Sequence, residues 1–206
     1  MSDMIQHLPA IALRGTTILP DMIVHFDVSR EKSIKAIEKA MVQDQRVFLI
    51  TQRDPQTEEP SQEDLYTVGT IGEIKQLVKN RKNMIQVLVE GKQRAELVHF
   101  ESEDVYLEAE VALFEEEEVS LDNNVKEAML RGIKELFVRY CNENTKMSKD
   151  LAGQILEIEE IEKVIDQIAV NLPMKYEDKQ KILESVSLEE RYETLGMILS
   201  NEIEIM

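Results

Sequence analysis

The side chains best suited to catalysis form no complete catalytic motif in this sequence. Ser29 and Lys32 have the S-x-x-K spacing of a serine nucleophile and its lysine base, but neither S-D-N nor K-T-G follows. We therefore expect Ser29 to cap the helix that follows it. No G-x-x-x-x-G-K-[ST] segment occurs, so the sequence has no phosphate-binding loop for nucleotide hydrolysis. We predict that this chain has no catalytic residues and is not itself an enzyme.

Residues that commonly bind metals are widely separated along the chain. His7, His25 and His99 match no zinc-binding spacing, so the sequence predicts no metal site and no cofactor-binding residue. The single cysteine, Cys141, has no partner for an internal disulfide, which fits a reducing, cytoplasmic environment.

A small group of residues is better suited to binding a polypeptide. Pro20 fixes a turn, and Met22 beside it offers a flexible apolar side chain that we expect to be exposed. Arg30, Glu31 and Lys32 fall at the start of the next predicted helix and would form a mixed-charge rim. We take these five residues as candidate substrate contacts, although each is also explained as scaffold or solvated surface.

The composition limits the classes of partner. The chain has 206 residues, is 43% hydrophobic and carries a formal charge of −17, which disfavours nucleic acid. One small basic patch, which we interpret as a solvated hairpin tip, contains Lys75, Lys79, Arg81 and Lys82. The sequence contains neither an apolar run of membrane-spanning length nor a signal-peptide pattern at its start, so we expect no membrane association.

The first half of the chain has the patterns of strands around one helix. Apolar runs and period-2 alternation predict strands, and one segment has the apolar spacing of an amphipathic helix. We expect Gly91 to turn the chain between two of the strands, with a positive φ. The predicted strands are 8–13, 23–28, 46–52, 67–78, 84–89, 93–100 and 106–114; the helix is 30–43, and 53–64 is a polar surface loop.

The second half, after the acidic run 115–118, has the spacing of helices. Ser148 and Ser187 are expected N-caps, and Pro173 should end the helix before it. The last helix reaches the end of the sequence with no stop signal, so we expect the chain to be part of a longer protein. The predicted helices are 121–140, 149–172, 176–184 and 188–206. These patterns predict an α+β fold with subdomains at 1–114 and 119–206: a partly closed β-barrel with one helix, then an α-helical bundle.

Three separated stretches resemble the amino-terminal domain of the Lon protease family. They are DLYTVGTIGEI at 64–74 with VLVEGKQRAEL at 87–97, the opening at 8–33, and the helical region at 168–205. The resemblance implies a PUA-like barrel followed by a helical bundle. It also implies a non-catalytic region of an ATP-dependent serine protease that recognises unfolded or damaged proteins and aids hexamer assembly. The ATP and Mg²⁺ of such a protease would bind in an ATPase module that is missing here.

A second interpretation stays open. A free-standing Lon-like domain with a PUA-like fold would bind RNA or a small ligand, and its gene would end soon after Met206. Since the Lon resemblance implies a hexamer whose driving contacts would belong largely to the missing modules, we expect the isolated chain to be a monomer or a weak dimer.

Overall fold

The computed structural model describes residues 4–80, 82, 84–114, 121–144 and 146–205. The chain separates into two compact units, Met1–Glu115 and Glu116–Met206, which are described separately below. The acidic run 115–118 lies outside the described residues. The predicted subdomain limits, 1–114 and 119–206, therefore stay a prediction.

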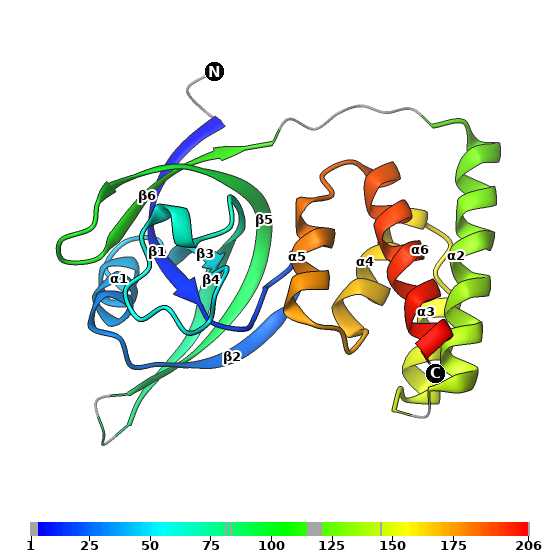
Figure 1. The fold of residues 1–206 in the computed structure, drawn as a ribbon, viewed down its shortest axis with the longest axis horizontal. Helices are drawn as coiled ribbons and strands as arrows, with labels where there is room; N and C mark the ends of the chain where they lie inside the picture. Colours follow the sequence, from blue (N-terminus) through cyan, green and yellow to red (C-terminus); the bar gives the residue numbers. More distant parts are fainter. Residues whose placement is uncertain (1–3, 81, 83, 115–120, 145, 206) are drawn as a thin grey trace. The chain divides into compact units, whose positions relative to one another are not determined.

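The first unit is built from six strands and one α-helix among its described residues (Figure 1). The strands follow the order β2-β5-β4-β3-β1-β6, and β6 also pairs with β5. This second pairing closes five strands into a circuit, while β2 extends from β5 on its outside, so the sheet is not a clean barrel. The elements are β1 (Ile5–Leu13), β2 (Ile23–Val28), α1 (Glu31–Met41), β3 (Arg46–Thr51), β4 (Val68–Lys79), β5 (Ile85–Ser102) and β6 (Leu107–Leu113).

Strand β3 and the part of β1 from Leu8 onward are buried on both faces, which explains the nearly continuous apolar sequences of these stretches. One face of β3 places Phe48 and Ile50 in a core to which all five strands of the closed circuit contribute. The other face places Val47 and Leu49 in a second core, against α1 and the first half of β5. The two cores hold the sheet and α1 together and so fix the start of α1 beside β1.

The predicted turn at Gly91 is wrong. β5 is one strand of 18 residues, and the only glycine with positive φ in the described chain is Gly15. A Cβ at position 91 would overlap the carbonyl oxygen of Leu19. The glycine is therefore required for the close approach of another backbone segment. Gly91 also lies at a register shift in the β4–β5 pairing, where Gly72 pairs with Gly91 and Ile71 pairs with Gln93.

The second unit contains five helices in its described residues: α2 (Asn123–Glu143), α3 (Lys149–Leu156), α4 (Ile161–Asn171), α5 (Tyr176–Glu184) and α6 (Leu188–Ile205) (Figure 1). The predicted caps are confirmed, since Ser148 Oγ accepts from Leu151 N at 3.5 Å and Ser187 Oγ accepts from Glu190 N at 3.1 Å. The single helix predicted over 149–172 is wrong, because the chain leaves helical geometry between α3 and α4. Within the described residues, no helix has the length and apolar character needed to cross a membrane.

Candidate functional site

A cleft in the first unit lies at the amino-terminal end of α1. This cleft, which we call the Arg30 cleft, has a volume of about 820 Å³. Its lining combines apolar side chains with charged side chains of both signs. It is lined by Ala12, Arg14, Arg30, Glu31, Lys32, Ser33, Lys35, Glu58, Glu59, Pro60, Ser61, Glu103, Asp104, Val105 and Leu107.

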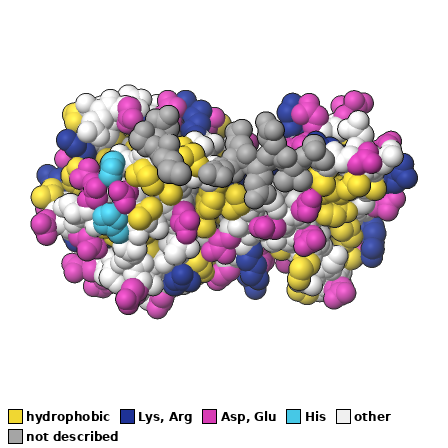
Figure 2. Space-filling model, turned by 90° about the horizontal axis from the view of Figure 1, so that it is seen from above, with side chains coloured by type: hydrophobic (Ala, Val, Ile, Leu, Met, Phe, Trp, Pro, Cys, Tyr) yellow, Lys and Arg dark blue, Asp and Glu magenta, His cyan; other side chains and the backbone are white. Residues whose placement is uncertain are grey.

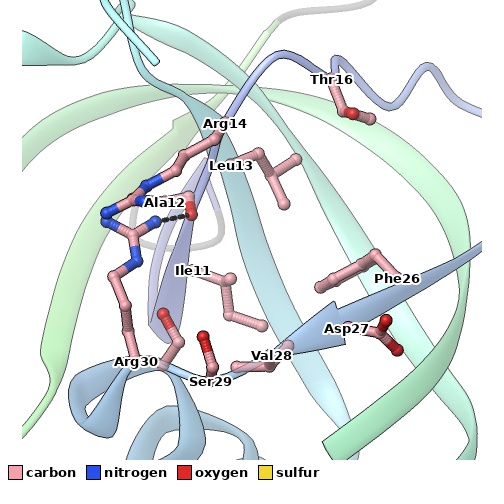
Figure 3. A pocket seen from close by; sticks show the side chains of 11 residues that line it. Ile11, Ala12, Leu13, Arg14, Thr16, Phe26, Asp27, Val28, Ser29 and Arg30 are labelled. Atoms are coloured by element: carbon pink, nitrogen blue, oxygen red, sulfur yellow. Dashed lines mark hydrogen bonds between the residues drawn. The ribbon is translucent and has the colours of Figure 1, made fainter. Parts of the chain in front are cut away.

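Two arginines meet at one wall of the Arg30 cleft. Arg30 Nη1 and Arg14 Nη2 lie 3.4 Å and 3.5 Å from the same acceptor, the carbonyl oxygen of Glu58. Arg30 Nη2 also donates to the carbonyl oxygen of Ala12 at 2.5 Å. Figure 3 shows the two guanidinium groups side by side at the end of β1.

This wall is electropositive because its two cations lie close together. Burial lowers the pKa of Arg30, and the neighbouring Arg14 charge lowers it further. Arginine nevertheless stays charged at neutral pH. α1 also begins here, with Arg30 at its N-cap position and no capping hydrogen bond from the Arg30 side chain. A carboxylate would therefore be stabilised at this wall, where fork-shaped guanidinium groups favour two hydrogen bonds to one carboxyl group.

The predicted role of Ser29 as N-cap is wrong, because the helix starts one residue later. Arg30 occupies the N-cap position with extended backbone, and its side chain bonds to Ala12 and Glu58 instead. Ser29 lines a smaller pocket next to the Arg30 cleft.

The loop 54–61, of which residues 58–61 line the Arg30 cleft, is bonded at its start to one buried glutamine. The Gln52 side chain is fully buried, and its Nε2 donates to the carbonyl oxygens of Asp54 at 3.1 Å and Thr57 at 2.9 Å. Further along, the Asp64 carboxylate accepts from the backbone N–H of Ser61 at 2.9 Å. The predicted surface loop therefore has a defined conformation, which presents the Glu58 carbonyl to both arginines.

The smaller pocket, of about 170 Å³, opens between two strands that do not pair with each other. One wall is the end of β1, beyond its pairing with β6, and the other is the end of β2. In the described chain β2 pairs only with β5, so its other edge is free. Figure 3 shows Ile11 of β1 and Val28 of β2 lining this pocket, with the Arg30 side chain beside them. The Arg30 cleft shares Ala12, Arg14, Arg30 and Ser33 with this pocket, so the two hollows are adjacent.

The five candidate residues predicted from sequence separate into two groups. Arg30, Glu31 and Lys32 line the Arg30 cleft, whereas Pro20 and Met22 line neither hollow. Met22 is partly buried against the core, and its Sδ accepts from Leu19 N at 3.2 Å, so the expectation that it is exposed is not met. Sequence reasoning missed Arg14 and Glu58, whose places depend on pairings between distant segments.

The basic patch predicted at the β4–β5 hairpin is partly neutralised. Lys75 Nζ lies 3.3 Å from carboxylate oxygens of both Glu73 and Glu90, and the bonds to them raise its pKa. Lys92 Nζ lies 3.1 Å from Glu90, and the bonds from Lys92 and then Lys75 lower the pKa of that carboxyl group. Arg81, also assigned to the patch, lies outside the described residues. This local pairing leaves less positive charge for a nucleic-acid phosphate.

Comparison with known proteins decides the family. A model of the family described as the ATP-dependent protease La (LON) substrate-binding domain matches residues 7–201. The chain belongs to this family. It is 46% identical over 206 residues to the Lon protease of Lachnoclostridium phytofermentans, and 36% identical over 199 residues to Lon protease 1 of Bacillus subtilis. These alignments cover 100% and 97% of the chain but 26% of each relative, so the chain spans about a quarter of their length.

Solved Lon structures have the same fold. The amino-terminal domain of the Mycobacterium avium complex Lon protease superposes with a TM-score of 0.73 at 17% identity, covering 97% of this chain and 98% of that one. A Lon amino-terminal domain protein from Xanthomonas campestris gives 0.63 at 14% identity, covering 92% and 96%. The predicted α+β fold of a Lon amino-terminal domain is thus confirmed.

Proposed function

We propose that this chain is the non-catalytic amino-terminal region of a Lon-type ATP-dependent serine protease and that it binds unfolded or damaged polypeptides in the Arg30 cleft. The observation that carries this proposal is the match of residues 7–201 to a substrate-binding domain. The cleft adds a place for the substrate, because it combines apolar side chains with charges of both signs and lies next to the free edge of β2.

An unfolded polypeptide would bind first through its backbone. The free edge of β2 presents N–H and C=O groups that an extended segment can pair with, whatever its sequence. Such a segment would continue from β2 past Arg30 into the Arg30 cleft. A folded protein has few extended segments without partners, so this mode of binding selects for unfolded chains.

The cleft then adds a limited side-chain preference. Val105 is 61% exposed at its rim, and it offers an apolar contact beside Pro60 and Leu107. Arg14 and Arg30 lie where an acidic side chain or a terminal carboxylate would gain charge-assisted hydrogen bonds. These contacts are few, so a single domain binds an unfolded polypeptide with a dissociation constant in the micromolar range or higher. Six copies in a hexamer would raise the effective affinity by roughly a hundredfold if one substrate engages several.

The remaining functional assignments follow from this proposal. The isolated chain is a monomer or weak dimer that associates with other Lon subunits through the missing modules. ATP and Mg²⁺ bind outside this chain, which needs no cofactor of its own. We place the protein in the cytoplasm, with proteins rather than nucleic acids or membranes as its partners.

The test is a titration with a fluorescently labelled, permanently unfolded protein, such as reduced and carboxymethylated α-lactalbumin, at physiological salt. The proposal predicts micromolar binding of the unfolded form and at least roughly tenfold weaker binding of native α-lactalbumin. Equal affinity for both forms would contradict it. Tighter binding of duplex DNA or RNA than of the unfolded protein would favour the alternative, a nucleic-acid-binding Lon-like domain.

A further inference from the structure

Two histidines that are 92 positions apart in the sequence meet on the outer face of the five-strand circuit. His7 on β1 pairs in register with Glu110 on β6, and His99 on β5 pairs with the same Glu110 from the other side. Three neighbouring strands thus carry a row His7–Glu110–His99. In Figure 2, histidine side chains (cyan) lie among carboxylates (magenta) on the surface of the β-rich unit.

Irregularities in β5 bring a fourth residue to this face. The β5–β6 register shifts between Leu97 and His99 and again between Phe100 and Ser102. The extra residue before His99 changes the alternation of the strand, so that His99 is exposed although Leu97, two positions earlier, is buried. Glu101 is the extra residue of the second shift, and it is exposed on the same side as His99.

The four side chains are close enough to act together. His7 Nδ1 lies 3.1 Å from Glu101 Oε2, and His99 Nδ1 lies 3.1 Å from Glu110 Oε2. One nitrogen or oxygen from each of His7, Glu101 and Glu110 lies within 4.8 Å of the other two. In the described part of the chain, the only basic side chains within 4 Å of these two carboxylates are the two histidines.

We propose that His7, Glu101 and Glu110 bind a divalent transition-metal ion, of which Zn²⁺ is the simplest example. Imidazole nitrogen together with carboxylate oxygen is a ligand set for Zn²⁺ and similar ions, and three such ligands leave one tetrahedral position for water. Ligand atoms at about 2.1 Å from a tetrahedral ion lie about 3.4 Å apart. Small rotations of the side chains reach this spacing, because His7 is 45% and Glu101 39% exposed.

His99 is a positioning residue for this site. Its Nδ1 lies beside the Glu110 carboxylate, where it holds one carboxylate oxygen and leaves the other for the ion. Hydrogen bonds of this kind orient metal ligands, and their loss typically weakens metal binding by about tenfold or more. The metal would join β1, β5 and β6, the strands whose pairing closes the five-strand circuit.

The experiment is a titration of the metal-free 206-residue chain with Zn²⁺ at pH 7.5, in competition with a chromophoric chelator. We expect one ion per chain. His7→Gln and Glu110→Gln are expected to weaken binding by tenfold or more, and His99→Gln by roughly tenfold. Zn²⁺ should also raise the unfolding temperature of the unmodified chain but not that of His7→Gln, since a ligand that binds the folded state stabilises it.

Two control variants make the result specific. His25 lies on β2, opposite Leu88, and is not one of the clustered residues, so His25→Gln should bind Zn²⁺ like the unmodified chain. Cys141→Ser, which removes the only thiol, should do the same. The proposal is overturned if no stoichiometric binding occurs, if His7→Gln binds as well as His25→Gln, or if Cys141→Ser alone abolishes binding.

Discussion

Gly91 of β5 lies directly against the backbone of Leu19, in the turn that precedes β2. The turn is joined to this glycine by two hydrogen bonds, from Asp21 N to Gly91 O and from Gly91 N to Met22 O, both 2.8 Å long. The contact fixes where β2 begins, and the end of β2 forms one wall of the smaller pocket next to the Arg30 cleft.

Gly91→Ala should be strongly destabilising. The added Cβ would overlap the Leu19 carbonyl oxygen, which belongs to a buried backbone segment that cannot move away freely. We expect a loss of about 1–3 kcal/mol in the free energy of unfolding, measured with urea. Gly153→Ala is the matched control. Position 153 is exposed in α3, and apart from its chain neighbours and the backbone of its own helix no atom lies within 4 Å of the new Cβ, so this change should stabilise by about 0.5–1 kcal/mol. Equal effects of the two substitutions would contradict the assigned role of Gly91.

Gln52→Leu should loosen the loop that forms one wall of the Arg30 cleft. The substitution removes both hydrogen bonds to the carbonyls of Asp54 and Thr57. Hydrogen exchange of the amides in 56–61 should become roughly tenfold faster, which corresponds to about 1.4 kcal/mol. Gln76→Leu changes an exposed glutamine on β4 and serves as the control. Unchanged exchange in this loop would show that Gln52 does not hold it.

Glu162 should contribute to the stability of the helical unit in a pH-dependent way. Its own backbone N–H, together with Lys126 at 3.2 Å, lowers the pKa of the carboxyl group below its ordinary value of 4.5, although partial desolvation opposes this. A carboxyl group with a lowered folded-state pKa stabilises the protein above the unfolded pKa, and this stabilisation is lost as the pH falls through the folded pKa. Glu162→Gln should therefore lose less stability than the unmodified chain between pH 5 and pH 3.

The difference for Glu162 should be small, about 0.5 kcal/mol, because the side chain is 44% exposed and screened by solvent. It is measured as the change in urea unfolding free energy at each pH. An identical loss of stability in both proteins would argue against the Lys126–Glu162 interaction.

Local sequence patterns predicted most of the individual elements but not the continuity between them. The strand at 23–28 was predicted at its exact limits, and the helix around 31–41 and the caps Ser148 and Ser187 were also identified. The turn predicted at Gly91 is wrong because a turn and a close approach of two backbone segments both require a residue without a Cβ, so the sequence does not distinguish them. The break between α3 and α4 has neither proline nor glycine, and its apolar spacing continues into the next helix, so the sequence carried no signal for it.

The site was only partly predictable for a related reason. Arg30 and Lys32 were found because they begin a helix, a feature visible in local sequence. Arg14 and Arg30 both contact the carbonyl oxygen of Glu58. The position of Glu58 depends on the loop conformation that the buried Gln52 side chain holds through its bond to the Thr57 carbonyl. His7 and His99 likewise come together only through the pairing of β1, β6 and β5. Such juxtapositions are properties of the fold, and spacing along the chain does not show them.

The central claim is that unfolded polypeptide binds at the Arg30 cleft, and a charge-reversal titration tests it most directly. Arg14 and Lys32 are exposed at the rim of the cleft, so the double substitution Arg14→Glu/Lys32→Glu should not disturb the fold. The control is Arg131→Glu/Arg139→Glu, which makes the same change in charge at two exposed positions of α2.

Both double variants and the unmodified chain are titrated against reduced and carboxymethylated α-lactalbumin at physiological salt. The account predicts a roughly tenfold or greater loss of affinity for Arg14→Glu/Lys32→Glu, about 1.4 kcal/mol, and little change for the α2 control. Equal loss in both variants, or no loss in the cleft variant, would contradict the claim that the cleft is where the substrate binds.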